Sequence, residues 1–167
     1  MKKIPRDLLS LAGEYRVCSE LNKRGMFATI TYGTRKSVDI YAIGDRHQRA
    51  LKIEVKTSQI RRFVTGIGQK QKRSTNGLEA PDYWVLVHVR RGLDGCYTER
   101  FFVLTHREIC RKQMARNRDY EKRFFARNRK KPNISRGVDN VTVADVEKYE
   151  GQWSKILDEK RLKGRVS

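Results

Sequence analysis

The sequence predicts an α/β domain in which one N-terminal helix precedes about five β-strands and a basic helical region follows them. Three observations support this fold class. Apolar residues recur at helical spacing near the start of the chain, short alternating β-type runs come next, and a long basic segment begins at a helix-capping sequence. A chain of 167 residues is most simply one domain, and it is long enough to bury a sizeable core.

The first predicted element is an amphipathic helix between Pro5 and Gly25, because proline favours the first turn of a helix and glycine the position just past its end. Its apolar stripe consists of Leu8, Leu11, Ala12, Tyr15, Cys18 and Leu21. Glu14 lies roughly 60° from Leu11 at about 100° per residue. It can therefore lean toward whatever the stripe packs against, and a solvated glutamate is the alternative.

Two β-type runs, 38–43 and 51–56, follow a predicted strand over 26–32, and the turn-rich residues between the two runs favour a hairpin. Side chains alternate along a strand, so Asp39, Glu54 and Lys56 are expected to meet at one end of the face opposite the core. Two carboxylates and a lysine within about 6–7 Å would form a site for a hard cation with an ammonium beside it. The alternative is the polar outer face of an ordinary hairpin.

Two basic segments adjoin this hairpin. The loop before Asp39 contains Thr34, Arg35, Lys36 and Ser37, which offer cations and hydroxyls to a phosphate. A glycine-rich stretch after Lys56 contains Arg61, Arg62, Lys70, Lys72 and Arg73, where a nucleic-acid backbone would have to pass. The alternatives are a polar turn and a solvated surface loop.

A second hairpin is expected from the apolar runs 83–89 and 96–104, which are separated by Leu93-Asp94-Gly95. The capping box Thr105-x-x-Glu108 then predicts a basic helix that starts near His106. Within it, Ala-Arg-Asn-Arg occurs at 115–118 and again at 126–129, eleven residues later, which returns to nearly the same helix face. The arginines of the two copies, which could form a ridge against phosphates, are Arg116, Arg118, Arg127 and Arg129. A solvated arm that orders only on a partner is the alternative.

A last helix is predicted to begin at the capping box Thr142-x-x-Asp145. Its apolar stripe, which we interpret as packing, consists of Val146, Tyr149, Trp153, Ile156 and Leu157.

The net charge of the chain indicates which kind of molecule it binds. The chain has 38 Lys and Arg residues against 19 Asp and Glu, a net charge of +19, which favours a polyanion such as nucleic acid. Charge alone does not separate DNA from RNA, or an enzyme from a passive binder. The three cysteines show no zinc-binding spacing, and no apolar segment approaches the length of a signal sequence or a membrane span, so we expect a cytoplasmic protein with reduced thiols.

The order helix, strand, hairpin, with Glu14, Asp39 and Glu54-Val55-Lys56 on successive elements, resembles the PD-(D/E)xK nuclease superfamily. The similarity is closest to the archaeal Holliday-junction-resolvase-like branch and covers about residues 8 to 60. Arg24-Gly25 at the helix end and Ile53 before Glu54 belong to the same pattern. Val38 stands where the family's nominal motif has proline, and the basic helix and the Trp153 segment have no counterpart in a minimal resolvase.

The resemblance implies a restriction-endonuclease-like mixed β-sheet flanked by helices, with a nuclease core over 1–104 and a basic helical extension over 105–167. It implies that Asp39, Glu54 and the main-chain carbonyl of Val55 hold Mg²⁺, or Mn²⁺ as a substitute. Lys56 would orient or deprotonate a water, or stabilise charge on phosphorus. Glu14 would support the metal shell through water. The implied reaction is hydrolysis of DNA phosphodiesters by a homodimer.

Three functions follow from these observations. The first is a metal-dependent DNA endonuclease, with branched DNA as one substrate class. The second is a restriction-like or homing-type endonuclease that recognises sequence. The third is a non-catalytic basic module that binds nucleic acid in a salt-dependent, metal-independent way.

Overall fold

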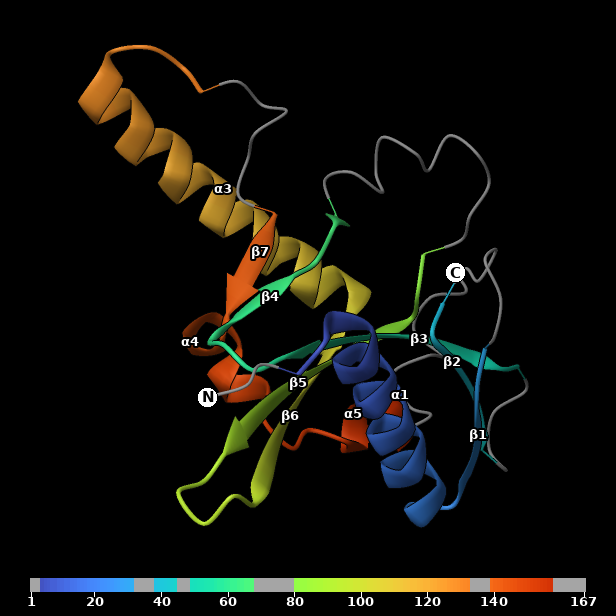
Figure 1. Cartoon of the computed structure of the whole chain (residues 1–167). Helices are drawn as coiled ribbons and strands as arrows, with labels where there is room; N and C mark the ends of the chain where they lie inside the picture. Colours follow the sequence, from blue (N-terminus) through green and yellow to red (C-terminus); the bar gives the residue numbers. More distant parts are fainter. Residues whose placement is uncertain (1–3, 32–37, 45–48, 68–79, 133–138, 158–167) are drawn as a thin grey trace.

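The computed structural model describes residues 4–31, 38–44, 49–67, 80–132 and 139–157, and its centre is a five-stranded sheet (Figure 1). The strand order is β1-β2-β3-β5-β6, and only β3 and β5 run parallel. The strands are β1 Met26–Ile30, β2 Ile40–Gly44, β3 Leu51–Ser58, β5 Tyr83–Arg91 and β6 Tyr97–Thr105. The prediction of an α/β fold with a mixed sheet of five strands is confirmed, and so are both hairpins.

Helix α1, Arg6–Lys23, covers one face of the sheet, but its buried side is not the predicted stripe. The buried residues are Leu9, Gly13, Glu14, Val17 and Leu21, whereas the predicted stripe residues Leu8, Leu11 and Tyr15 are exposed. The reason is Gly13, where a Cβ atom would lie 1.8 Å from Oγ1 of Thr57 on β3. A helix packed through its glycine approaches the strand closely, and the row at i, i+4 and i+8 around Gly13 becomes the inner face.

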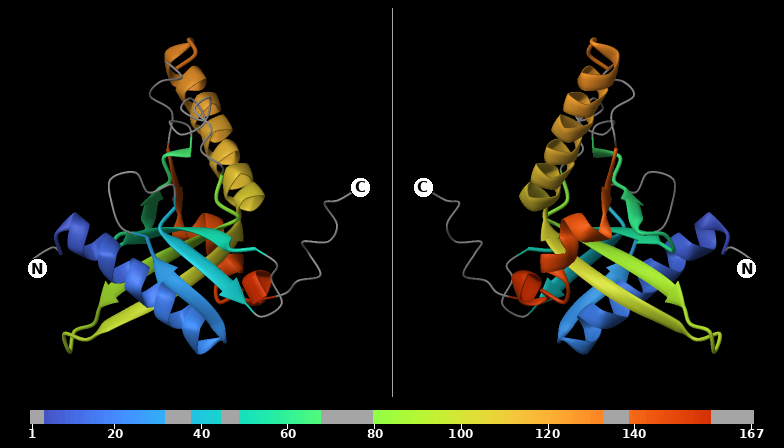
Figure 2. Two further views of the ribbon diagram at one scale, coloured as in Figure 1. Left: turned by 90° about the vertical axis from the view of Figure 1, so that its right-hand side faces the viewer. Right: turned by 90° about the vertical axis from the view of Figure 1, so that its left-hand side faces the viewer.

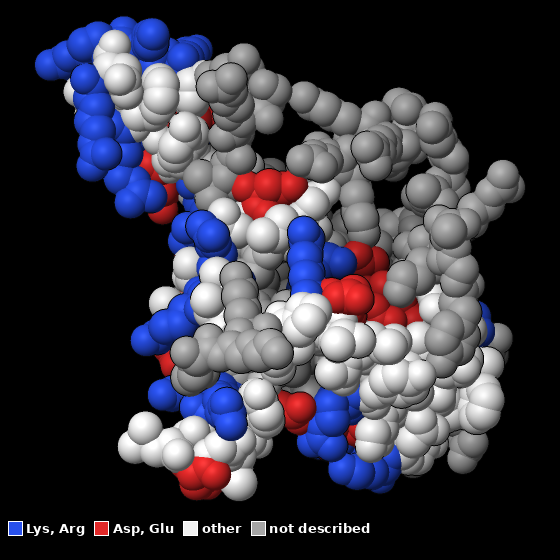
Figure 3. All heavy atoms as spheres, viewed as in Figure 1, with Lys and Arg blue, Asp and Glu red and all other residues white. Residues whose placement is uncertain are grey.

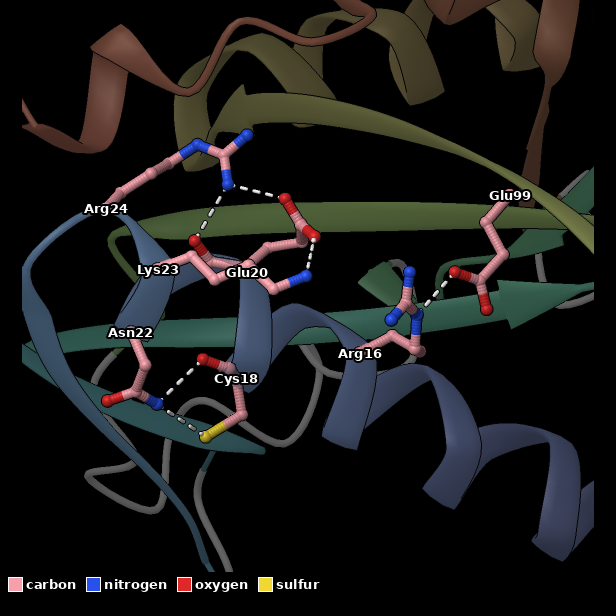
Figure 4. A network of polar contacts seen from close by, with 7 residues as sticks. All are labelled: Arg16, Cys18, Glu20, Asn22, Lys23, Arg24 and Glu99. Atoms are coloured by element: carbon pink, nitrogen blue, oxygen red, sulfur yellow. Dashed lines mark hydrogen bonds and ion pairs between the residues drawn. The ribbon is translucent and has the colours of Figure 1, made fainter.

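Ion pairs hold the outer side of α1 (Figure 4). Arg16 contacts Glu99 of β6 at 2.5 Å, and Glu20 contacts both Lys23 and Arg24. The hydrogen bond from Arg24, with a smaller effect from Lys23, lowers the pKa of Glu20 below its usual value. Exposed pairs of this kind contribute about 0–1 kcal/mol each, so they orient the end of the helix more than they stabilise it.

A second layer covers the opposite face of the sheet. It contains the two-stranded sheet of β4, Arg62–Val64, and β7, Asn140–Thr142, together with α4, Val143–Val146. Phe63 of β4 and Val141 of β7 are buried in one core cluster with Trp84 and Phe102. The sequence does not predict β4 or β7, because each has three residues and its partner lies more than seventy positions away in the chain.

Helix α3, His106–Asn128, begins as predicted at a capping box in which Thr105 and Glu108 exchange hydrogen bonds. Its first turns lie on the sheet, since Ile109 belongs to the core cluster that contains Trp84. The indole Nε1 of Trp84 also donates a 3.1 Å hydrogen bond to Nδ1 of His106. The proposed division at residue 104 stays a prediction.

The predicted last helix is not continuous. The chain forms α4, a 3₁₀ turn over Glu147–Tyr149 and α5, Ser154–Leu157, with a break at Gly151, whose φ is +63°. Glu150 pairs there with Phe102 at the edge of β6. Four of the five apolar residues are buried as expected and Leu157 is partly buried, but they belong to two clusters: Val146 and Tyr149 lie on one face of the sheet, and Trp153 and Ile156 on the other. No described helix is long and apolar enough to cross a membrane.

The ion pair between Glu108 and Lys155 joins the start of α3 to α5, with Nζ of Lys155 at 2.9 and 2.8 Å from the two carboxylate oxygens. We expect Glu108→Gln to lower the free energy of unfolding by about 3 kcal/mol at pH 7, because it leaves the Lys155 ammonium buried without its counter-charge. Glutamine preserves the capping box. Urea unfolding measures the loss.

The same variant should show a pH dependence. Burial alone would raise the pKa of Glu108, but the Lys155 ammonium and the Thr105 N–H outweigh it and hold that pKa below 4.5. Because the folded-state pKa is lowered, the ionised Glu108 contributes fully to the free energy of unfolding above pH 4.5. This contribution is lost as the pH falls through the folded-state pKa, so the difference in stability between Glu108→Gln and wild type should shrink in acid. The control is Glu147→Gln, whose exposed pair with Arg100 should cost under about 1 kcal/mol. An equal loss at pH 7 and pH 3.5 would contradict the assignment.

Candidate active site

The candidate site lies where β2 and β3 separate. Their pairing runs from Ala42↔Leu51 to Ile40↔Ile53, and β3 then continues to Ser58. Continued by one residue, the register sets Asp39 opposite Glu54, and the main chain supports this because the Asp39 N–H donates to the Ile53 carbonyl at 3.1 Å. The two acids of the predicted motif are therefore brought to neighbouring positions by the antiparallel pairing.

Beyond this point the Asp39 side chain continues the contact between the two segments. Its Oδ2 accepts a 2.8 Å hydrogen bond from the N–H of Val55, in the place where a further strand residue would accept it. The carboxylate is held by the backbone of β3, and it is 7% exposed. Its position is thus fixed by the sheet and not by a loop.

A cleft of about 850 Å³ opens at this fork between α1 and β4. Its lining residues come from the start of the chain and α1, from Asp39, from the end of β3 and from β4: Ile4, Pro5, Arg6, Leu9, Ser10, Glu14, Asp39, Val55, Lys56, Thr57, Ser58, Gln59, Ile60, Arg62 and Val64. Figure 3 shows acidic side chains beside the upper, N-terminal end of α1, next to a group of basic ones. The cleft therefore combines carboxylates with cations.

Lys56 links the cleft to Glu54. Its Nζ donates to Oε1 of Glu54 at 2.7 Å and lies 5.9 Å from the centre of the Trp84 ring. Trp84 is in turn fixed by its hydrogen bond to His106. The Lys56 side chain is 30% exposed and the Glu54 side chain is 5% exposed. The buried Glu54 therefore orients the ammonium, which remains accessible from the cleft.

The structure thus places Glu14, Asp39, Val55 and Lys56 in the lining of one cleft. Glu54 is outside that lining and joins it through Lys56. The three acids are all buried. Among the residues that the structure describes, no three His, Cys, Asp or Glu side chains are close enough together to hold a metal ion, so Glu14 does not form a three-carboxylate cluster with the other two acids.

The donor chemistry of this site suits a hard divalent cation. Asp39, Glu54 and the Val55 carbonyl supply oxygen ligands, which Mg²⁺ prefers, and Mg²⁺ usually keeps several waters beside one or two carboxylates. Burying a carboxylate costs several kcal/mol unless positive charge compensates. Lys56 supplies one positive charge to Glu54. A bound divalent cation would provide further compensation for this pair of buried acids.

The other predicted nucleic-acid contacts divide into three groups. Arg61 and Arg62 are exposed, and Arg62 lines the cleft. Four arginines lie on α3 or at its C-terminal cap and are treated below. The remaining predicted residues, Thr34, Arg35, Lys36, Ser37, Lys70, Lys72 and Arg73, lie outside the described residues.

Several cleft residues are absent from the prediction. Arg6 and Ser10 lie on α1 in the same i, i+4 row as Glu14, and Thr57 and Gln59 follow the motif lysine. The row was detectable in the sequence, since polar residues at 6, 10 and 14 share one helix face. The sequence analysis does not include this row, because the larger apolar residues predict a different inner side of the helix.

His88 does not belong to the site, although it pairs across the sheet with Ser58, a cleft residue. It is 5% exposed. Burial, followed by the nearby charges of Arg100, Arg90 and Arg61, lowers its pKa below 6.5, so the ring is neutral at pH 7. Because it does not line the cleft, it is not a candidate general base.

Solved structures include chains with a fold similar to this one. No protein-family model matches the chain, and no curated protein matches it. The chain is similar to a solved structure of a bacterial homing endonuclease, I-Ssp6803I, with 14% sequence identity, a TM-score of 0.48 and coverage of 100% of both chains.

Proposed function

We propose that this chain is a metal-dependent nuclease that hydrolyses phosphodiester bonds of DNA. The observation that carries the proposal is the fork between β2 and β3, where the carboxylate of Asp39 is held on the backbone of Val55 and the next residue, Lys56, presents an oriented ammonium to the same cleft. The net charge of +19 supports a polyanionic substrate.

Asp39, Glu54 and the carbonyl of Val55 would hold Mg²⁺ or Mn²⁺. When bound, such an ion supplies a Lewis acid for the scissile phosphate and lowers the pKa of a bound water. Glu14, buried in the wall formed by α1, would accept hydrogen bonds from waters around that site.

Lys56 has the chemistry to act on the reacting phosphate. Glu54 and Trp84 fix the direction of its side chain, which lowers the entropic cost of placing the ammonium against a phosphoryl oxygen. A cation preorganised in a partly buried cleft stabilises negative charge that develops in the transition state. Arg6 and Arg62, at the wall formed by α1 and β4, would bind the flanking phosphates.

The direct test is cleavage of supercoiled plasmid, linear duplex and four-way-junction DNA in Mg²⁺, with EDTA as the metal-free control. Wild type should cleave at least one substrate, and Asp39→Ala should cleave none. Glu147→Ala, which removes an exposed glutamate of the 3₁₀ turn outside both the cleft lining and α3, should behave as wild type. Equal activity in the wild type and Asp39→Ala, or no activity of the wild type on any substrate, would exclude the proposal.

Metal binding provides a readout that does not depend on activity. A ligand that binds only the folded state at 100 times its dissociation constant stabilises by about 2.7 kcal/mol. Mn²⁺ should therefore raise the melting temperature of wild type and of Glu147→Ala, but not that of Asp39→Ala. A rise of equal size in all three proteins would place the metal elsewhere.

The strong positive charge also fits a second function, that of a basic module that binds nucleic acid without cutting it. It predicts salt-dependent, metal-independent binding and no cleavage. Branched-DNA and sequence-specific endonucleases are separated by the same substrate panel, because the former cleaves the junction preferentially and the latter cleaves a linear duplex at a fixed position. The homodimer implied by the family resemblance stays a prediction, which sedimentation can test.

A further inference from the structure

The second half of α3 projects from the domain. The helix has 23 residues, which corresponds to about 35 Å at 1.5 Å per residue, and its buried residues are Ile109 and Gln113. After Gln113 no side chain of the helix is buried. Figures 1 and 2 show this part leaving the body of the domain, away from both layers that cover the sheet.

The root of the helix is well anchored. Gln113 accepts a 2.8 Å hydrogen bond from the Thr65 hydroxyl, and Arg116 pairs with Asp145 at 3.0 Å. Burial acts to raise the pKa of Asp145, but the hydrogen bonds from Thr142, followed by the charge of Arg116, outweigh it and hold that pKa below its usual value. Arg116, one of the four arginines of the repeated motif, is thereby engaged with α4.

Residues 118–131, which we call the distal arm, are strongly basic. They contain seven Lys or Arg residues against two acids, a net charge of +5. The cations are Arg118, Lys122, Arg123, Arg127, Arg129, Lys130 and Lys131, and all are exposed. Figure 3 shows basic side chains gathered at the tip of this helix.

The four cations of the distal arm that lie on α3, which ends at Asn128, form two rows and not one ridge. At about 100° per residue, Arg118 and Lys122 lie within about 40° of each other, as do Arg123 and Arg127, and the two rows are roughly 140° apart. The eleven-residue repeat does return to the same direction, but the two arginines in each copy lie two positions apart and so point to nearly opposite sides. Like charges at i, i+4 within each row repel and destabilise the free helix.

This arrangement matches duplex DNA. The major groove of B-form DNA is about 12 Å wide and admits an α-helix, with a phosphate strand along each side. A helix with a row of cations on each flank can contact both strands at once, whereas a single strand satisfies one row only. The repulsion within each row also decreases when phosphates neutralise it.

We propose that the distal arm lies in the major groove of duplex DNA, with the Arg118 and Lys122 row against one backbone and the Arg123 and Arg127 row against the other. The proposal rests on the proposed function for its choice of DNA. According to this proposal, the substrate is double-stranded DNA. Part of the binding energy comes from the distal arm, which is separate from the cleft.

The test measures binding without cleavage, in the Asp39→Ala background, by fluorescence anisotropy with a 30-base-pair duplex and the corresponding single strand. The test variant changes Arg118, Lys122, Arg123 and Arg127 to Gln, which preserves helix propensity and removes the repulsion. The matched control changes four other exposed cations, Arg16, Lys23, Arg90 and Arg91, to Gln. Far-UV circular dichroism checks that α3 is intact.

We expect the arm variant to bind the duplex at least tenfold more weakly at 0.15 M salt, and the slope of log K against log salt to fall by about 3–4, from roughly 0.9 per phosphate contact. Substituting only one of the two rows should lower the slope by about half as much. The control should stay within twofold of the parent protein. Binding of the single strand should fall less than binding of the duplex.

Three outcomes would overturn the proposal: unchanged duplex affinity in the arm variant, an equal loss on duplex and single strand, or tighter binding of duplex RNA than of duplex DNA. The last is diagnostic because the major groove of A-form RNA is too deep and narrow for side chains to read. Failure of the nuclease proposal is recognised separately, since it shows as absence of cleavage by wild type while the binding comparison is unaffected.

Discussion

Replacing Lys56 with glutamine should lower the rate of DNA cleavage by roughly 10³-fold while DNA binding changes by less than about threefold. The ammonium is one residue from the Asp39–Val55 contact and is oriented by Glu54 and Trp84, so its charge acts at the reacting phosphate more than on the rest of the substrate. Single-turnover cleavage at saturating protein measures the chemical step, and anisotropy in Ca²⁺ or EDTA measures binding.

The matched control is Lys52→Gln. Lys52 has the same side chain on the same face of β3, four residues before Lys56, but does not line the cleft. It should cleave within threefold of wild type. If Lys52→Gln and Lys56→Gln lose activity equally, the effect is one of overall charge, and Lys56 has no special role in the reaction.

Gly13→Ala should lower the free energy of unfolding by about 2–3 kcal/mol, because an added Cβ would lie 1.8 Å from Oγ1 and 2.9 Å from Cβ of Thr57. Alanine has a higher helix propensity than glycine by roughly 1 kcal/mol, so a loss of stability would show that packing against β3 outweighs propensity. The variant should also cleave DNA more slowly, since moving α1 away from β3 displaces Glu14 from the cleft.

A double-mutant cycle with Thr57→Gly separates packing from other effects. Removing the Thr57 side chain eliminates the clash, so Gly13→Ala should be neutral or stabilising in the Thr57→Gly background. Urea unfolding of the four proteins gives the coupling energy. Additive effects of the two substitutions would mean that α1 does not pack through Gly13.

The elements with strong local signals were predictable from the sequence. The capping box at Thr105 and Glu108 fixes the start of α3, and the alternating residues around Asp39 and Glu54 define a hairpin that the structure confirms. The motif positions followed from that hairpin, because antiparallel pairing brings residues at a constant sum of sequence numbers opposite each other.

The remaining features depend on tertiary contacts. The inner face of α1 is decided by the close approach of Gly13 to Thr57, and a glycine carries no hydrophobic signal. Strands β4 and β7 are too short to show a period, and the break at Gly151 follows from the pairing of Glu150 with Phe102. At the site, Glu54 lies outside the cleft lining although it shares a strand face with Lys56, and alternation along one strand does not reveal this difference.

The passage of the chain around the edge of β6 has a consequence for biosynthesis. Both hydrophobic cores contain residues from one short segment near the C-terminal end of the described chain. One core includes Val141, Val143, Val146 and Tyr149, and the other includes Trp153 and Ile156. Neither core is complete before this segment is in place. Domains generally fold as units during translation. A ribosome-bound chain that ends before Val141 would therefore hold an assembled sheet with both faces incompletely covered, and compact folding is expected only after this segment has left the exit tunnel.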